Sequence, residues 1–209
     1  MNSTIARRGI LLVLSSPSGA GKTTIAKKVL ENDTNISISI SATTRPKRPH
    51  EVANVDYYFL SPEEFDVWEK DGLFIEHARV FDNRYGTPKK PVLDALSKGQ
   101  DLLFDIDWQG TLQLSKLMPD DIVKIFILPP SRTELVNRLN LRAQDDAKVI
   151  DNRMLKANDE LSHWEGYDYI IINEALEVSV ANILSILKAE RLRRDRLLNM
   201  TQFVQSLSM

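Results

Sequence analysis

The 209-residue chain contains no cysteine, which excludes disulfide scaffolds, thiol nucleophiles and cysteine-ligated metal sites. Its three histidines, His50, His77 and His163, are scattered and do not form a metal-binding motif. The net charge is only −2, so the composition does not indicate a surface for nucleic acid or for a membrane. Any functional basic residues must therefore be clustered locally.

Long hydrophobic runs are also missing. Ile10–Leu14 and Ile125–Leu128 are far too short to span a bilayer. Residues 1–9 carry two arginines but lack the apolar stretch of a signal peptide. We therefore expect a cytoplasmic protein with neither a nucleic-acid nor a membrane partner. The sequence does not indicate an oligomeric state.

Short apolar runs alternate with helical patterns, which is typical of a mostly parallel sheet covered by helices. Each run is apolar almost throughout, as expected for strands buried on both faces. The predicted strands are Ile10–Leu14, Leu102–Ile106, Ile122–Leu128 and Tyr169–Ile172. The sequence therefore predicts an α/β fold.

Three helices begin at recognisable sequences. Ser61-Pro62-Glu63-Glu64 combines an N-cap serine, a proline at the first helical position and a capping-box glutamate. Ser131-Arg132-Thr133-Glu134 has the same capping-box spacing. Thr87-Pro88 is expected to open a third helix, which should end at Gly99.

Two stretches interrupt the alternation and are interpreted as lobes inserted into one domain at residues 8–189. The first lobe is predicted at about residues 36–95 and the second, rich in arginine, at about 131–163. The core is then formed by residues 8–35, 96–130 and 164–189, followed by a helical tail at 190–209. The arginines at the start of the tail are expected on a solvated face: Arg191, Arg193, Arg194 and Arg196.

Residues 16–23 form the sharpest local signal, because they lie between a predicted strand and an amphipathic helical run. Gly19 and Gly21 let the backbone curl so that its N–H groups face phosphate oxygens, and the following helix adds its positive end. Lys22 is predicted to reach the β and γ phosphates, and Thr23 to hold Mg²⁺ through its hydroxyl. The predicted nucleotide-binding residues are Ser16, Pro17, Ser18, Gly19, Ala20, Gly21, Lys22 and Thr23.

This P-loop indicates a nucleotide but not a reaction. Ser16 stands where the motif usually has its first glycine, and a glycine-rich turn without nucleotide is the alternative. One short domain with two inserted lobes favours a kinase that acts on a small molecule.

A second group of residues could hold an acceptor. Arg45 and Arg48, with the hydroxyl of Tyr57, could form a forked clamp for a phosphate. Composition alone equally allows a solvated basic loop. Glu76 and Thr87 offer a carboxylate and a hydroxyl, although a single glutamate is usually exposed.

Taken together, these motifs resemble those of guanylate kinases, over about residues 9–194. The matching pieces stand in family order and spacing, which is far more specific than any one motif. They are SPSGAGKT, SATTR, FIEHA, RYGT, FDIDWQG, FILPPS and YDYIIIN.

The resemblance implies a role for each matching position. Glu76 would accept hydrogen bonds from guanine N1–H and from the 2-amino group, so AMP would be rejected. Ser41 and Thr87 would supply hydroxyls to the base edge, with turn or N-cap duty as the alternative. The GMP phosphate would be held by Arg45, Arg48, Tyr57 and Tyr85.

The resemblance also implies an acidic pair and a lid. Asp105 would lie near GMP and the Mg²⁺ water shell with Asp107 in support, although Asp107 could instead cap a helix. Asn173 matches a position that contacts adenine. The second lobe would close over ATP as a lid, unless its arginines are only a solubilising surface. Its catalytic arginines would be Arg138, Arg142 and Arg153.

The implied reaction transfers the γ-phosphoryl group of ATP to GMP, and also to dGMP, with Mg²⁺ as cofactor. The alternatives are a non-catalytic binding module of the same family and a kinase of a phosphorylated ribose. Several positions depart from the family pattern and are expected to alter loop geometry: His50, Pro46, Asn54, Val55, Arg84 and Ala143.

Overall fold

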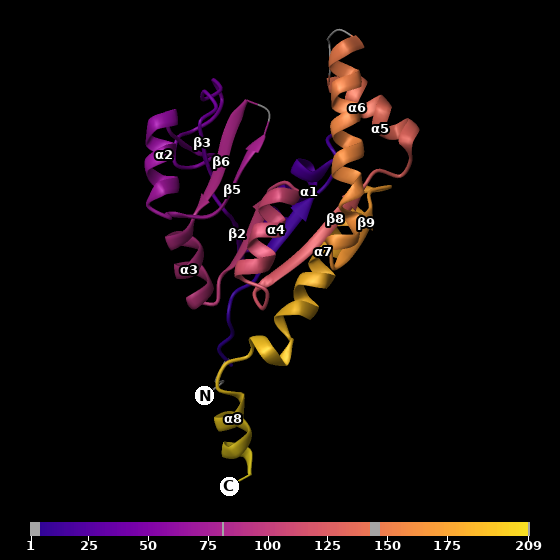
Figure 1. Cartoon of the computed structure of the whole chain (residues 1–209). Coiled ribbons are helices and arrows are strands. Elements are labelled where there is room, and N and C mark those ends of the chain that lie inside the picture. The colour runs from indigo at the N-terminus through magenta and orange to yellow at the C-terminus, as the bar shows by residue number, and fades with distance from the viewer. Residues whose placement is uncertain (1–4, 81, 143–146, 209) are drawn as a thin grey trace.

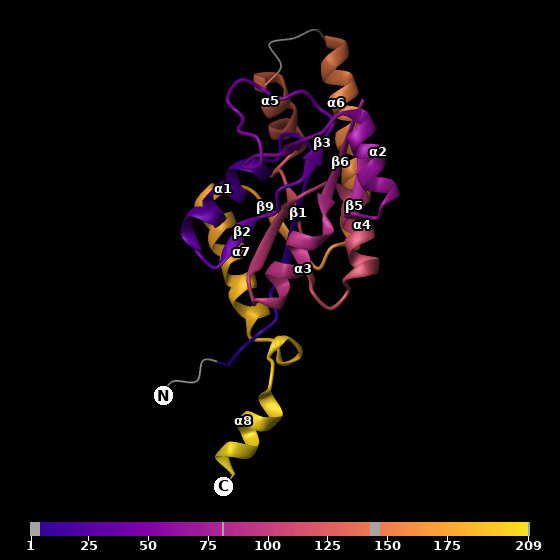
Figure 2. The same cartoon turned by 90° about the vertical axis from the view of Figure 1, so that its left-hand side faces the viewer.

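The computed structural model describes residues 5–80, 82–142 and 147–208, and the side chains of residues 141–153 lie outside this description. A five-stranded parallel sheet in the order β2-β7-β1-β8-β9 forms the core, with helices on both faces (Figures 1 and 2). Its strands are β1 (Leu11–Ser15), β2 (Ile36–Ile38), β7 (Asp101–Asp105), β8 (Ile122–Leu128) and β9 (Tyr169–Ile172). The α/β prediction and the four predicted strands are confirmed within a residue.

The central strand β1 is buried along its whole length because it pairs with β7 on one side and with β8 on the other. Its side chains alternate between two hydrophobic clusters. Leu12 and Leu14 pack with α1 (Lys22–Asn32) and α7 (Leu176–Arg191). Leu11 and Val13 pack with α3 (Lys89–Ser97) and α4 (Trp108–Leu117). A rigid sheet thus supports the loops at its carboxyl-terminal edge.

The first lobe contains a second, four-stranded sheet in the order β4-β3-β6-β5, covered by α2. Ser61 caps α2 with both hydrogen bonds of a capping box, as predicted. The elements are β3 (Ala42–Thr43), β4 (Tyr58–Phe59), α2 (Pro62–Lys70), β5 (Phe74–Val80) and β6 (Asn83–Pro88).

One predicted boundary in this region needs correction. The predicted start of the lobe at residue 36 is too early, because Ile36–Ile38 pairs with β7 in the core sheet. Thr87-Pro88 ends strand β6, and the predicted helix follows it directly at Lys89, with Pro88 at the N-cap position and no side-chain cap. The predicted end of that helix is confirmed, since α3 stops at Ser97 and Gly99 follows with φ 73°.

The second lobe is a helix pair, α5 (Arg132–Arg142) and α6 (Ala147–Ser162), which packs through Leu135, Leu139 and Ala157. A 3₁₀ turn, η1 (Trp164–Gly166), leads back to β9. Ser131 Oγ accepts a hydrogen bond from the Glu134 backbone at 3.1 Å, but the Glu134 carboxylate bonds Arg138 instead of completing the capping box. Figure 1 shows the first lobe (purple) and this lid (orange) on opposite sides of the core sheet.

The tail is helical in separate pieces, and its predicted solvated arginines are confirmed at Arg193 and Arg194 but not at Arg191 and Arg196. After α7 come the 3₁₀ turn η2 (Arg194–Arg196) and α8 (Met200–Leu207). Arg191 pairs with Asp33 at 2.6 Å and with Asp101 at 2.7 Å, and Arg196 is only 3% exposed. Arg191 is held by the fully buried carboxylate of Asp101, which also pairs with Arg7, because a buried charge needs a partner. Arg196 pairs instead with the buried carboxylate of Glu190 at 3.1 Å.

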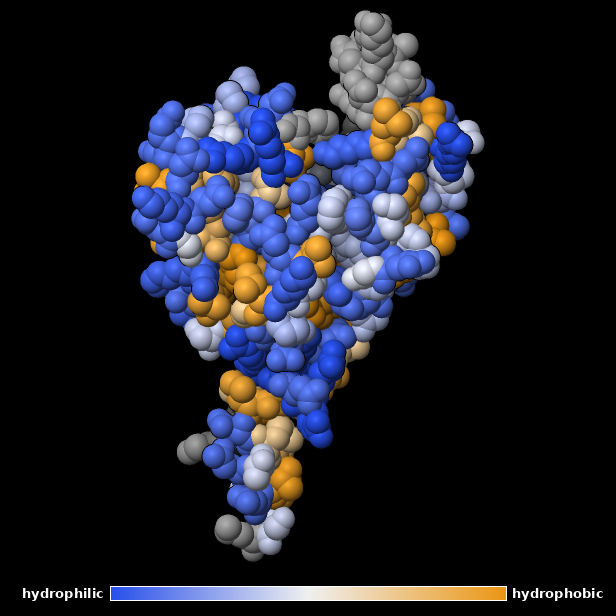
Figure 3. All heavy atoms as spheres, viewed as in Figure 1, coloured by the Kyte–Doolittle hydropathy of each residue, from blue (hydrophilic) through white to orange (hydrophobic). Residues whose placement is uncertain are grey.

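Helix α8 projects away from the body, and both chain ends lie on the side opposite the two lobes (Figures 1 and 2). Figure 3 shows hydrophilic residues over most of the face in view, with hydrophobic residues in several places on the body and on α8. Among the described residues, no helix is both long and apolar enough to cross a membrane.

Candidate active site

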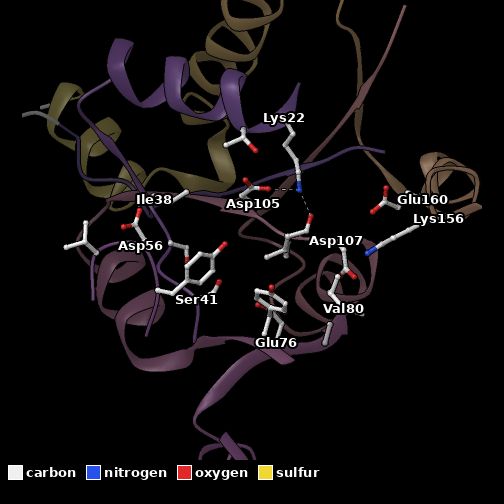
Figure 4. A pocket seen from close by; sticks show the side chains of 17 residues that line it. Lys22, Ile38, Ser41, Asp56, Glu76, Val80, Asp105, Asp107, Lys156 and Glu160 are labelled. Carbon is white, nitrogen blue, oxygen red and sulfur yellow. Dashed lines mark hydrogen bonds and ion pairs between the residues drawn. The ribbon is translucent and has the colours of Figure 1, made fainter. Parts of the chain in front are cut away.

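Two adjoining cavities lie at the carboxyl-terminal edge of the core sheet. One, of about 470 Å³, extends from the P-loop to the first lobe, and the other, of about 720 Å³, covers the P-loop. Both are lined by Lys22, Thr23, Asp105, Lys156 and Glu160. The donor and acceptor halves that the sequence predicts therefore meet at Lys22 and Asp105 (Figure 4).

The P-loop has the backbone that phosphate binding needs. Gly19 and Gly21 have φ 91° and 97°, a region that favours glycine. Asn173 ties this loop to α7. Its Nδ2 donates to the Ala20 carbonyl at 2.8 Å, and its Oδ1 accepts from Ser179 Oγ at 2.9 Å. Asn173 is 7% exposed and lines a third cavity of about 370 Å³ beside Gly21. Asn173 thus braces the P-loop, and its contact with adenine stays a prediction.

Lys22 and Asp105 form an ion pair, with Nζ and Oδ1 2.5 Å apart. Burial by itself would lower the pKa of Lys22, but the charge and hydrogen bond of Asp105 outweigh it and raise this pKa. Lys22 Nζ also donates to the Ile106 carbonyl at 3.3 Å. The lysine is therefore charged and held at the junction of the two cavities.

Asp107 has the role that the sequence left as an alternative, because it caps α4. Its Oδ1 accepts from the backbone N–H groups of Gln109 and Gly110, both at 3.1 Å. Thr23 and Asp105 are both accessible from the cavities. Within the described part of the chain, no group of three or more histidine or acidic side chains is arranged to hold a metal ion. The Thr23 hydroxyl and the Asp105 carboxylate are oxygen ligands of the kind that Mg²⁺ takes together with water.

Glu76 lies on β5 at the far end of the first cavity and is only 3% exposed. Thr87 Oγ1 donates to its Oε1 at 2.5 Å, and Ser41 Oγ lies 3.2 Å from the Thr87 hydroxyl. Burial raises the pKa of Glu76 to about 7, with a smaller contribution from the negative charge of Asp107. The three predicted base-edge residues are thus brought together in a buried polar chain.

The predicted phosphate clamp is held by a residue to which the sequence analysis gave no role. Glu51 accepts from Arg45 Nη2 at 2.6 Å and from the Arg48 backbone at 2.8 Å, and these bonds lower its pKa to about 2. The Arg45 guanidinium also lies over the Tyr57 ring, 5.5 Å from its centroid, and Tyr57 packs edge-on against Tyr85. The only sequence signal for this role of Glu51 was the position of its carboxylate three residues after Arg48.

The lid makes two contacts with the P-loop, through Arg138 and Glu160. Arg138 reaches the P-loop, with Nη1 3.5 Å from the Ala20 carbonyl. The side chains of Arg142 and Arg153, on α5 and α6, lie outside the described part of the structure. Sequence reasoning missed Glu160, whose Oε2 accepts from the backbone N–H of Ser18 at 2.8 Å. Burial raises the pKa of Glu160. The only sequence signal for a role of Glu160 was its position one helical turn after Lys156.

The departures at Asn54 and Arg84 have structural explanations. Asn54 has φ 65°, a left-handed conformation that asparagine tolerates where glycine is usual. Arg84 pairs with Asp66 and lies over the Phe65 ring at 4.7 Å, on the α2 side of the lobe sheet. His50 is exposed, and Ala143 lies outside the described residues.

Comparisons with known proteins agree with this arrangement. Residues 8–190 match the guanylate kinase family. Guanylate kinases from Paramagnetospirillum magneticum and Nitrobacter hamburgensis are 53% and 54% identical over 98% and 97% of this chain, and over 95% and 93% of their own lengths. A crystal structure of guanylate kinase from Anaplasma phagocytophilum superposes with a TM-score of 0.81 at 39% identity, covering 98% of this chain and 97% of that one. The chain belongs to the guanylate kinase family.

Proposed function

We propose that this guanylate kinase transfers the γ-phosphoryl group of ATP to GMP, and by the same contacts to dGMP, giving ADP and GDP. The observation that carries the proposal is the buried Glu76 carboxylate at one end of a cavity that has the P-loop Lys22 at the other. A kinase of a phosphorylated ribose would not need a buried carboxylate to read a base.

Guanine recognition follows from the chemistry of Glu76. An ionised carboxylate accepts two hydrogen bonds, and guanine presents N1–H and the 2-amino group as two adjacent donors. Adenine would leave the buried charge unpaired, which is strongly unfavourable. The GMP phosphate would lie against Arg45, Arg48, Tyr57 and Tyr85, with Glu51 fixing the direction of Arg45.

ATP would bind with its phosphates on the P-loop N–H groups and on Lys22, which would exchange part of its bond to Asp105 for phosphate oxygens. Mg²⁺ would supply positive charge to the phosphates when it is bound. Thr23 and Asp105 would hold it, together with water, while Asp107 supports Asp105 indirectly as the cap of α4.

Transfer needs no general base, because the second pKa of a phosphate monoester is near 6 and the attacking oxygen is already ionised. The protein must instead offset the repulsion between two polyanions and stabilise charge on the transferring group. Lys22 and Arg138 face the donor cavities, and Arg142 and Arg153 would complete the lid side. We place this activity in the cytoplasm, with ATP and GMP as the only partners required.

A coupled assay with ATP, Mg²⁺ and a panel of nucleoside monophosphates and ribose phosphates tests the proposal. GMP should be the preferred acceptor in wild-type protein. Lys22→Met should reduce turnover more than a hundredfold with an unchanged circular dichroism spectrum, whereas Lys27→Met, on an exposed position of the same helix, should not. A non-catalytic module would show no turnover in any arm, and a ribose-phosphate kinase would prefer the sugar.

A further inference from the structure

Helix α4 of the core makes an unusual contact with β5 of the first lobe. β5 is the last strand of its sheet, so one of its edges has no neighbouring strand. At His77 this edge is satisfied by the Gln113 side chain, whose Oε1 accepts from His77 N at 3.1 Å while its Nε2 donates to His77 O at 2.7 Å. One side-chain amide thus provides the donor and acceptor of a missing strand, directly beside Glu76.

Gly110 lies one turn earlier on α4 and faces the Glu76 carboxylate itself. A Cβ built on Gly110 would lie 2.6 Å from Glu76 Oε2 and 3.2 Å from its Cδ. The backbone of Gly110 does not have the positive φ that favours glycine, so only the lack of space accounts for this residue. Gly110 is the third residue of α4, where alanine is the better helix former, and a requirement of the site would explain the glycine.

We propose that Gly110 and Gln113 are positioning residues that set where the base-reading carboxylate of Glu76 stands. Gln113 fixes β5 against α4, and Gly110 leaves room for the carboxylate to approach the helix. Because the same helix begins at Asp107, just beyond Asp105, the guanine end of the site is held at a fixed distance from the phosphate end. The inference rests on the proposed function, since it concerns GMP selection.

The first test compares Gly110→Ala with Gly166→Ala, a matched control in which the added Cβ meets nothing within 4 Å. Gly110→Ala should raise KM for GMP tenfold or more, change KM for ATP less than twofold and reduce kcat less than threefold. It should also reduce the preference for GMP over IMP, which lacks the 2-amino group. Gly166→Ala should match wild type in all these measurements.

Two further variants separate positioning from a general effect on folding. Glu76→Asp in the Gly110→Ala background shortens the carboxyl side chain, so the double variant should have a higher kcat/KM for GMP than the two single effects combined predict. Gln113→Leu removes both bonds to His77 at similar volume and should raise KM for GMP several-fold, again without changing KM for ATP.

The inference is overturned if both Gly110→Ala and Gln113→Leu keep the wild-type KM for GMP, or if they raise KM for GMP and ATP equally. If the effects of Gly110→Ala and Glu76→Asp on kcat/KM are additive in the double variant, Gly110 does not act through the position of the Glu76 carboxylate. Absence of GMP turnover in wild-type protein would instead refute the proposed function, and this inference with it.

Discussion

Glu76→Gln should show opposite effects on function and on stability. The variant places an amide donor where guanine also presents a donor, while the amide oxygen can still accept from Thr87. A hydrogen bond to a charged group contributes about 1.5–3 kcal/mol, and 1.4 kcal/mol is tenfold in affinity. We therefore expect kcat/KM for GMP to fall roughly a hundredfold or more, with little change in KM for ATP, since the P-loop lies at the other end of the site.

The stability effect follows from the pKa of Glu76, which burial raises from 4.5 to about 7. Between these pH values the folded state binds more protons than the unfolded state, so the contribution of this group to stability is lost as pH rises through that window. The raised pKa corresponds to roughly 3 kcal/mol against the ionised form. Empty Glu76→Gln protein should thus be more stable than wild type at pH 8, and nearly equal to it at pH 5.

Thermal unfolding at both pH values, without nucleotide, measures this difference. We expect a Tm gain of several degrees at pH 8, whereas Glu165→Gln, at an exposed position, should show none. Unchanged GMP kinetics, or equal losses for GMP and ATP, would show that Glu76 does not read the base. A Tm difference independent of pH would refute the buried-charge argument.

Three further results are expected. Glu51→Gln should raise KM for GMP about tenfold and leave KM for ATP unchanged, because Arg45 loses its charged partner; steady-state kinetics would contradict this if both constants moved together. Glu160→Gln should bind ATP several-fold more tightly in calorimetry, since the negative charge beside the Ser18 N–H no longer repels phosphate, and weaker binding would argue against this role. A bisubstrate analogue should reduce the radius of gyration in small-angle scattering as the two lobes close, and an unchanged value at saturation would count against closure.

The sequence predicted those parts of the fold in which a short segment determines its own structure. Strand β1 is apolar because it is buried on both faces, and the Ser61 capping box completes itself within four residues. The P-loop belongs to the same class, since two glycines determine its backbone. In each case the information is local.

The errors concern interactions between residues far apart in the sequence. The sequence predicted a solvated Arg191, but this arginine pairs with Asp33 and Asp101, which lie 158 and 90 residues away. β2 has only three residues and becomes a strand through pairing with β7, so its own sequence did not reveal it. The same limit hid Glu160, whose partner lies in the P-loop, 142 residues earlier.

The sequence revealed the site residues that belong to family motifs. It did not reveal the residues that hold those site residues in place. Motifs located Glu76, Thr87 and Lys22, and the structure places Glu76 and Lys22 on one cavity, with Thr87 hydrogen-bonded to Glu76. Glu51 and Gln113 act on the backbone or on other side chains, and the distances that define such supports exist only in the folded chain.

The lobe and the lid are each joined to the core by two chain crossings, because each is inserted between core strands. The first lobe departs after β2 and returns through α3 to β7, and the lid departs after β8 and returns to β9. Two attachment points define a line, so the lid has one axis about which it can rotate easily, while translation would strain both connections. The first lobe has a third tie to the core, because Gln113 of α4 bonds the backbone of β5. Approach of the ATP phosphates to GMP is therefore restricted to an arc of the lid, which favours the in-line orientation that phosphoryl transfer requires.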